Sequence, residues 1–391
     1  MILKNATICD ESKFQISDIQ IKDDIIVKID SDIKENDETI DCRDKIVMPQ
    51  FIDLNIFPKN KSLSRKNLES LAKKAKNGGV GILILNSNTN PKIDNEMILE
   101  FIKSINKELE ITIYPLISST DNENKLIDIS ILNSLGGIGV NLQSSSSSNT
   151  IDKIAKYAKM LDIPVFVNAD DDLGGVINYG EMSAKLGLPA RNPLSEIKEV
   201  AKILEVAIFY NIKVIFQTIT ETRSIHLINE AKKTNPNIFC ETSIHHLLLN
   251  DTACDGYNTL AKINPPLKDK KSQEALIESF KNNQIDLLTS MQCACYKSLK
   301  EQLFEQAEYG IDTIGSYFSL IYSYLIKTNI TDLQTISRIC SKNPAMILGL
   351  NCGEIKVSKE AKLMIIDINS NNTIEDSPYN KDLFGKVQQF I

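Results

Sequence analysis

Residues 48–60 read MPQFIDLNIFPKN. An apolar run over residues 51–54 leads into Asn55, Ile56 and Phe57, a pattern that predicts a buried strand and its end. Alternate side chains of a strand point to the same side, so residues 55 and 57 would share the side on which this strand presents chemistry. An amide and a phenyl ring occupy the two positions, with nothing ionisable or metal-binding between them.

Similar apolar runs recur along the chain, with amphipathic helical segments between most of them. Eight such strands over roughly 240 residues match the count and scale of a (β/α)8 TIM barrel. A doubly wound open sheet also alternates strands and helices, but no glycine-rich phosphate loop follows the first strand. The predicted strands are 51–54, 81–85, 111–116, 137–141, 164–167, 213–217, 238–242 and 285–289. The predicted helices include 66–77, 96–107, 150–161, 195–210, 224–233 and 271–281.

Both ends of the chain have a different texture. The first residues predict short strands separated by polar turns. Helices are predicted to follow the eighth barrel strand, and short strands come after them. We therefore expect a small β-sandwich domain built from residues 1–50 plus 351–391, beside a barrel of residues 51–350. The terminal strands are predicted at 2–3 with 6–8, 16–21, 25–29, 40–42, 354–357 and 363–368, and the helices at 311–327, 331–341 and 343–349.

The composition argues against a nucleic-acid-binding protein and against a membrane protein. The chain has 391 residues, with 44 Lys and Arg against 51 Asp and Glu, and these charges are spread without a basic block. This argues against nucleic acid as a partner. No secretory signal begins the chain and no apolar run of 18 residues occurs, so we expect a cytoplasmic protein without membrane contact. Eight scattered cysteines indicate reduced thiols, and there are three histidines.

Chemistry in such a barrel collects at the carboxyl ends of the strands, so those ends supply the candidate site residues. They are Asn55 and Phe57, residues 86–91, Asn141 to Gln143, Asn168 to Asp171, Gln217 and Thr218, His245 and His246, and Thr289 to Met291.

At these positions the sequence resembles the dihydroorotases of the amidohydrolase superfamily. The stretch MPQFIDLNIF (48–57) resembles the family's first-strand motif Pro-Gly-Phe-Ile-Asp-Leu-His-x-His, and NSNTNP (86–91) resembles its Met-Pro-Asn-Thr-Asn-Pro. The likeness continues in the same order over nearly the whole chain. The further segments that carry it are AKMLDIPVFVNADD (158–171), GEMSAKLGLPARNP (180–193), TSIHHLLLND (242–251), KINPPL (262–267) and SKNPAMILGL (341–350).

The resemblance implies a binuclear metal centre, usually zinc, whose hydroxide opens or closes the ring amide of dihydroorotate while a strand-eight Asp moves the proton. Several His and acidic ligands hold the two metals in the family. The corresponding positions here read Asn55, Phe57, Gln143 or the serines after it, Asn168, Thr218 and, for the proton carrier, Ser290 with Met291 beside it. Three histidines cannot supply four imidazoles, and His245 and His246 match a family pair that does not bind metal. We therefore expect no catalytic residues, no metal ligands and no cofactor.

The substrate positions are better preserved. By resemblance, Asn88 and Asn264 match asparagines that contact dihydroorotate, and Lys59 stands where an Arg pairs with the substrate carboxylate. A lysine offers a point charge in place of a bidentate fork. Residues 309–311, preceded by Glu308 in place of a Pro, match the segment that closes on the substrate. Asn88 and Asn264 could instead hold loops through hydrogen bonds to the backbone.

Two further groups of side chains could hold a metal in principle. Cys293 and Cys295 could form half of a soft-metal site with His245 or His246, although buried Cys often behaves as a small apolar residue. Asp170, Asp171 and Asp172 could attract a hard cation, although three adjacent acids cannot all face inward and a solvated loop is the simpler interpretation.

The sequence therefore favours a non-catalytic dihydroorotase homologue with a structural or regulatory role. The resemblance implies aspartate carbamoyltransferase as its partner in a homo- or hetero-oligomer, because some bacteria keep such chains beside an active dihydroorotase. One alternative is an enzyme, a cyclic amide hydrolase with an atypical or partner-completed site. Another is a small-molecule sensor that uses the remaining pocket.

Overall fold

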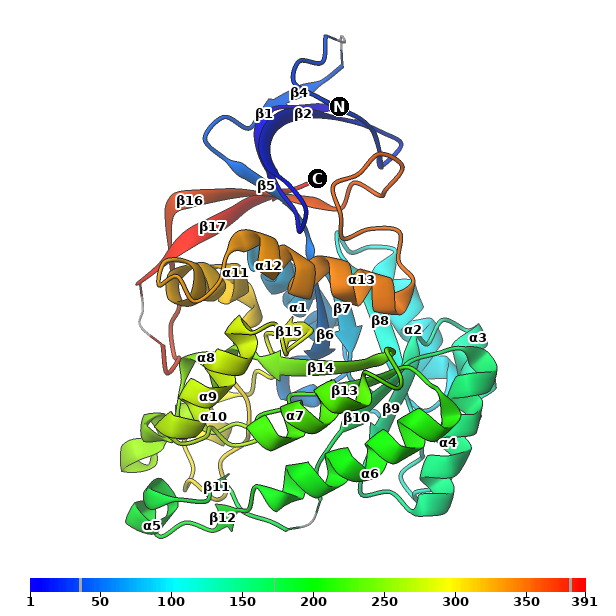
Figure 1. The fold of residues 1–391 in the computed structure, drawn as a ribbon, viewed down its shortest axis with the longest axis vertical. Helices are drawn as coiled ribbons and strands as arrows, with labels where there is room; N and C mark the ends of the chain where they lie inside the picture. The colour runs from blue at the N-terminus through cyan, green and yellow to red at the C-terminus, as the bar shows by residue number, and fades with distance from the viewer. Residues whose placement is uncertain (35–36, 172, 380–381) are drawn as a thin grey trace.

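The barrel strands pair in the order in which they occur along the chain. The structure is a computed structural model that describes residues 1–34, 37–171, 173–379 and 382–391. Its eight-stranded parallel sheet runs β6 to β10 and then β13 to β15, and Figure 1 shows the helices around it. All eight predicted strands are confirmed as β6 (Phe51–Ile56), β7 (Val80–Leu85), β8 (Thr112–Ser118), β9 (Gly139–Gln143), β10 (Val165–Asn168), β13 (Val214–Gln217), β14 (Ile238–Ser243) and β15 (Leu287–Thr289).

The helices pack their apolar faces on the outside of this sheet. The first one, α1 (Arg65–Asn77), begins where the Ser64 side chain accepts the N–H of Asn67, and it buries Leu68, Leu71 and Ala75. The other predicted barrel helices are found within two residues of their expected starts and ends. They are α2 (Glu96–Asn106), α4 (Ser148–Leu161), α6 (Leu194–Tyr210), α7 (Thr222–Ala231) and α9 (Lys270–Lys281).

Several short elements were not predicted from sequence. One is α3 (Ile129–Ser134), which fills the connection between β8 and β9 with too few residues to show a helical period. Another is the pair β11 (Ile177–Asn178) and β12 (Ala190–Arg191), which brackets α5 (Glu181–Leu186). Figure 1 shows this excursion at the end of the molecule remote from the chain termini. Short α-helices also form at α8 (Ile244–Leu248) and α10 (Lys297–Lys300), and 3-10 helices form at Lys59–Lys61, Asp251–Tyr257, Thr259–Ala261 and Ile314–Ser316.

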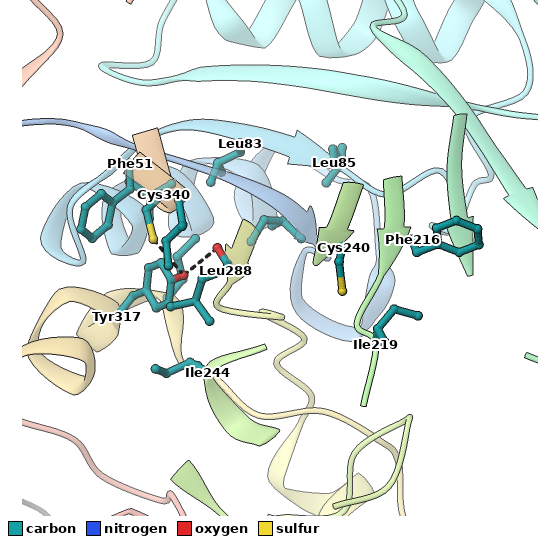
Figure 2. Packing of buried hydrophobic residues seen from close by; sticks show 14 of the residues in the cluster. Phe51, Leu83, Leu85, Phe216, Ile219, Cys240, Ile244, Leu288, Tyr317 and Cys340 are labelled. Carbon is teal, nitrogen blue, oxygen red and sulfur yellow. Dashed lines mark hydrogen bonds between the residues drawn. The ribbon is translucent and has the colours of Figure 1, made fainter. Parts of the chain in front are cut away.

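A buried carboxyl group joins the first and last strands of the barrel. β6 and β15 stand at the two ends of the described ladder order. Asp53 of β6 accepts the hydroxyl of Thr289 at 2.5 Å and the backbone N–H of Ser290 at 2.8 Å. Nearby, the Tyr317 hydroxyl donates to the carbonyl of Leu288 at 2.9 Å, as Figure 2 shows. Side chains therefore close the barrel where the strand ladder ends.

The two ends of the chain meet in one sheet. Its order is β17-β16-β5-β1-β2-β3, with β4 paired to β1, so the sandwich expected at the termini takes the form of a single strand-rich unit. Figure 1 shows both termini in this unit at one end of the barrel. The domain boundaries at residues 50 and 351 stay a prediction. The strands are β1 (Ile2–Cys9), β2 (Phe14–Lys22), β3 (Ile25–Asp30), β4 (Thr39–Asp41), β5 (Ile46–Pro49), β16 (Leu363–Thr373) and β17 (Asp382–Phe390).

Two expectations for the terminal strands were wrong. Residues 2–3 and 6–8 form one strand, because a bulge between Leu3 and Ala6 absorbs the polar residues between them. Residues 354–357 are not a strand. The backbone N–H of Ile355 instead donates to the Asp10 carboxylate at 3.0 Å, and its carbonyl accepts the Lys13 ammonium at 2.9 Å. Side chains thus satisfy the backbone groups that a neighbouring strand would have paired.

The helices after β15 attach the terminal sheet to the barrel. They are α11 (Tyr317–Ile321), which continues as a π-helical turn at Tyr322–Ile326, α12 (Leu333–Ser337), which continues likewise at Arg338–Lys342, and α13 (Asn343–Leu348). Ser319 of α11 donates to the carbonyl of Gly385 in β17 at 2.5 Å. A Cβ at Gly385 would lie 3.0 Å from the rings of Phe318 and Tyr322, so this close approach requires glycine. In the described part of the chain no helix is long and apolar enough to cross a membrane.

Candidate functional site

A cavity of about 170 Å³ opens at the carboxyl ends of the barrel strands. Most of its polar lining consists of carboxamide side chains, and Lys61 is the one lysine, arginine or carboxylate residue among the described residues that line it. The amides are Asn55, Asn86, Asn88, Gln143, Asn168, Gln217 and Asn264. The other lining residues are Phe57, Thr218, Pro265, Met291, Cys293, Tyr309 and Gly310.

A bulge in β6 turns Asn55 toward this cavity. Ile52 and Leu54 pack in an apolar cluster shared with other barrel strands, whereas Ile56 packs in the larger cluster with the helices. Between Asp53 and Ile56 the register with β7 shifts, because Asp53 pairs with Leu83 and Ile56 with Leu85. The extra residue reverses the alternation beyond Asp53. Asn55 and Phe57 consequently both line the cavity, on the side where chemistry was expected.

The structure brings together most of the residues singled out from the sequence. Asn55 and Phe57 line the same cavity as the candidates that follow other strands, which are Asn88, Asn168, Thr218 and Asn264. Ser290 does not line it among the described residues, and its backbone N–H donates to Asp53 at 2.8 Å. The positions expected for metal ligands therefore converge, but the groups they carry are amides, a hydroxyl and a phenyl ring.

The cation of the cavity is Lys61 and not Lys59. Lys59 lines a neighbouring cavity, and its ammonium lies 4.6 Å from the centre of the Tyr296 ring. The chain turns sharply between the two lysines, because Asn60 and Lys61 adopt left-handed φ angles of 54° and 55°. Lys61 places its ammonium 5.3 Å from the centre of the Phe57 ring. Sequence analysis did not single out Lys61, because strand alternation does not continue through such a turn.

Four strand ends are linked by a chain of side-chain hydrogen bonds. The amide of Asn55 donates to the Thr218 hydroxyl at 3.0 Å. The amide of Asn86 reaches the Asn55 oxygen at 3.5 Å, and the amide of Asn141 donates to the Asn86 oxygen at 2.9 Å. This amide chain runs through β6, β9 and the residues that directly follow β7 and β13. Neutral groups therefore satisfy one another where ions would otherwise be needed.

Two acids are fully buried next to this chain. Asp53 accepts the Thr289 hydroxyl, and Glu241 of β14 accepts the backbone N–H of Thr218 at 3.2 Å. Burial raises the pKa of both carboxyl groups, and the charge of Asp53 adds to the increase in the pKa of Glu241. Neither acid lines the cavity among the described residues. Both belong to the packing behind it.

His245 and His246 are buried with all four ring nitrogens engaged. His245 meets the Tyr379 hydroxyl at 2.6 Å and the Thr313 hydroxyl at 3.2 Å. His246 meets the Ser243 hydroxyl at 2.7 Å and the carbonyl of Pro265 at 3.0 Å. Burial lowers the pKa of both imidazoles to about 3, so they are neutral near physiological pH. They tie β14 and α8 to neighbouring segments.

The two neighbouring thiols lie in different cavities. Cys293 lines the amide-rich cavity, whereas Cys295 lines the one that contains Lys59. Burial raises the pKa of Cys293 to about 11, so the group is a thiol near neutral pH. The pair does not converge on one point as half of a metal site would require.

The acids after β10 have cationic partners. Asp170 pairs with Arg191, and Asp171 pairs with Lys198. Arg191 also donates to the side-chain oxygen of Asn264 at 2.9 Å, at the rim of the cavity. The third acid, Asp172, lies outside the described residues.

The donors of this cavity do not fit a zinc centre. Zinc in proteins takes imidazole nitrogen, thiolate or carboxylate ligands. Within the described ranges, no group of three or more His, Cys, Asp or Glu side chains could hold a metal ion. The cavity is lined by amides, hydroxyls, a thioether and a single thiol, that of Cys293. No step through a metal is therefore derived for this chain.

The fold is the amidohydrolase type of TIM barrel, with one strand-rich unit that is formed by the two ends of the chain. The L-hydantoinase (dihydropyrimidinase) of Arthrobacter aurescens superposes with a TM-score of 0.87 over 100% of this chain and 94% of that one, at 18% identity. A D-hydantoinase structure gives a TM-score of 0.83 at 22% identity, covering 100% of this chain and 93% of that one. At these identities the likeness concerns the fold.

Sequence comparison identifies the family. A Helicobacter pylori protein named "Probable dihydroorotase-like protein" is 30% identical over 396 residues, covering 100% of this chain and 96% of that protein. A dihydroorotase of Acetivibrio thermocellus is 29% identical over 373 residues, covering 92% and 87%. No family model matches the chain. The chain belongs to the dihydroorotase-like proteins of the amidohydrolase superfamily, which confirms the resemblance found in the sequence.

Proposed function

We propose that this chain is a non-catalytic dihydroorotase homologue with a structural or regulatory role in pyrimidine biosynthesis. The observation that carries the proposal is the amide chain from Thr218 through Asn55 and Asn86 to Asn141. By the family resemblance, two of its members, Asn55 and Thr218, stand at positions of metal ligands. A polar network that is already satisfied has no need of a metal to neutralise it.

The protonation states near the cavity support the same proposal. Opening a ring amide requires a strong nucleophile and a group that moves a proton near neutral pH. His245 and His246 are neutral with both ring nitrogens engaged, and Cys293 has a pKa of about 11. The carboxyl group of the buried Asp53 accepts hydrogen bonds from the Thr289 hydroxyl and from the backbone N–H of Ser290. None of these groups is poised to generate or accept a proton in the cavity.

We further propose aspartate carbamoyltransferase as the partner of this chain, as the family resemblance implies. Several large apolar side chains are exposed in the segments that follow the barrel strands. These residues are Leu173, Tyr179, Leu194, Tyr257, Tyr296 and Leu303. Native extract from the source organism tests the partnership by affinity capture of the chain, with mass spectrometry for aspartate carbamoyltransferase. A stoichiometric complex is expected. If the captured chain is native and no aspartate carbamoyltransferase accompanies it, the partnership is contradicted.

The capture experiment also separates the enzymatic alternative. An active site completed by a partner would give dihydroorotate hydrolysis in the complex, none in the isolated chain, and loss of activity after substitution of Asn55 or Thr218. A structural role predicts that whatever activity the complex contains is unchanged by Asn55→Ala. A separate dihydroorotase subunit would account for that activity.

Ligand sensing is a second candidate function, and the cavity itself favours it. A cavity lined by seven amides and one lysine can bind a small polar anion without transforming it. Carbamoyl aspartate and dihydroorotate are the ligands to test by thermal shift, because a ligand that binds only the folded state raises the midpoint of unfolding. Saturable shifts without turnover are expected from a sensor, and the absence of any shift would exclude these two ligands.

A further inference from the structure

We propose that a second cavity, beside the amide-rich one, binds a small zwitterion of the amino-acid type. This inference does not depend on the proposed function. The second cavity has a volume of about 510 Å³ and shares Gly310 with the first. Three lysines and four carboxylates line it, and that mixture of charges is the reason for the proposal.

On the cationic side of the second cavity, the ammonium group of Lys300 is buried and held in place by hydrogen bonds. The Lys300 residue is only 7% exposed, and its Nζ donates to the carbonyls of Thr259 at 3.0 Å and Lys262 at 3.1 Å. An ammonium has three N–H donors, so one remains after these two bonds. Burial lowers the pKa of Lys300, which also indicates that a charge here lacks full compensation. Lys59 stands in the same lining, held over the ring of Tyr296.

Two of the four acids are already paired with lysines. Asp312 pairs with Lys74, and Glu301 lies 3.8 Å from the ammonium of Lys297. These pairs account for one of the three lining lysines and for two of the acids.

The other two acids, Glu375 and Asp376, belong to the segment between β16 and β17. Neither has an ion-pair partner within the ranges that the structure describes. The lining therefore holds two available cations, Lys59 and Lys300, together with two available carboxylates.

This arrangement selects among simple ligands. A phosphate or other plain anion would meet repulsion from Glu375 and Asp376, and a metal cation would meet repulsion from Lys59 and Lys300. A free amino acid carries a carboxylate for the lysines and an ammonium for the acids, so it compensates both sets of charges. Lys300 is buried, whereas Lys59, Glu375 and Asp376 are exposed at the mouth of the cavity. Charge-assisted hydrogen bonds are the stronger class of polar contact.

Gly310 gives the second cavity a route to influence the first. Its backbone N–H donates to the carbonyl of Lys262 at 3.0 Å, and its φ is 116°. A Cβ at this position would lie 2.1 Å from the carbonyl oxygen of Cys293, a residue that lines the first cavity. The same backbone thus forms a wall of both spaces, and a zwitterion that orders it would also order the wall beside Cys293.

Isothermal titration calorimetry on the full chain tests the proposal with three forms of one ligand. L-leucine and L-methionine are compared with their N-acetyl derivatives, which lack the ammonium, and with their amides, which lack the carboxylate. We expect the free amino acids to bind and each blocked form to bind at least about tenfold more weakly, because each loses one charged hydrogen-bonding group. Absence of heat from both free amino acids at millimolar concentration, or equal binding of all three forms, would overturn the proposal.

Single substitutions assign the two charges. Glu375→Gln should weaken the binding of the free amino acid and leave the weak binding of the N-acetyl form unchanged. Lys59→Met should weaken the binding of the free amino acid and leave the weak binding of the amide form unchanged. Lys281→Met, an exposed lysine of α9, serves as the matched control and should change neither. Binding that is unaffected by both Glu375→Gln and Lys59→Met would place the ligand elsewhere and overturn the proposal.

Discussion

The side-chain amide of Asn55 donates to the hydroxyl of Thr218 at 3.0 Å and so ties the first barrel strand to the strand β13 across the cavity. Both residues stand at positions where the dihydroorotase family carries histidine ligands. In this chain a hydrogen bond between two neutral groups joins these positions.

Asn55→Ala should lower the free energy of unfolding by about 1–3 kcal/mol, because it leaves the Thr218 hydroxyl and the Asn86 amide without their partner in a buried site. Urea denaturation followed by circular dichroism measures the change. Asn168→Ala is the matched control, since Asn168 lines the same cavity and its side chain has no hydrogen-bond partner within the described residues. Equal losses in the two variants would show that the amide chain adds no stability.

Glu241→Gln should make the stability of the protein less dependent on pH. Burial raises the pKa of Glu241 above its ordinary value of 4.5, so the folded state holds the proton more tightly than the unfolded state. Its contribution to stability is complete below pH 4.5 and falls as pH rises toward the raised pKa. The free energy of unfolding of the variant minus that of the native chain should therefore be more positive at pH 8 than at pH 5.

Urea titrations at the two pH values measure this difference, and Glu274→Gln on the exposed face of α9 is the control. A difference that is the same at pH 5 and pH 8, or that is smaller at pH 8, would contradict a pKa of Glu241 that is raised in the folded state.

Tyr379→Phe should lower the free energy of unfolding by about 1–3 kcal/mol, because it leaves Nδ1 of the buried His245 without its partner at 2.6 Å. The C-terminal segment should also become more open to proteolysis, since this bond attaches it to the barrel. Tyr179→Phe, at a site that is 67% exposed, should have no measurable effect on either property. Unchanged stability and cleavage in Tyr379→Phe would mean that ring packing alone holds the segment.

Lys61→Met should abolish the thermal shift that carbamoyl aspartate gives with the native chain, because Lys61 is the one charged lysine among the described residues lining the amide-rich cavity. The exposed Lys73→Met on α1 should retain the full shift. Lys59→Met is the informative comparison, since the family resemblance selects Lys59 and the structure selects Lys61. A shift lost in Lys59→Met and retained in Lys61→Met would favour Lys59 as the residue that binds the ligand.

The parts of the fold that could be predicted from sequence are those with long, fully buried patterns. β7 is a six-residue apolar run that is buried throughout, and the other barrel strands were predicted from similar runs. The six-residue α3 is too short to show a helical period, and it was not predicted. β5 and β17 were not predicted either, although β5 is buried throughout and β17 spans nine residues. The region around Ile355 is apolar but finds its hydrogen bonds in side chains, so its composition misled the strand prediction.

The residues of the candidate site could be predicted from sequence, but the hydrogen bonds between them could not. Strand ends nominate Asn55, Phe57, Asn168 and Thr218 because parallel strands present their carboxyl ends at one face. The link from Asn55 to Thr218 depends on the bulge in β6, which no local pattern reveals. The choice of Lys61 over Lys59 depends on two left-handed residues in succession.

The most direct test of the account is the combined measurement of dihydroorotase activity and metal content on the chain purified without chelator. A non-catalytic homologue is expected to show no hydrolysis of dihydroorotate and no cyclisation of carbamoyl aspartate above background, with or without added zinc. Elemental analysis is expected to find less than stoichiometric zinc. Turnover at a rate typical of enzymes, by protein that carries two equivalents of zinc, would contradict it.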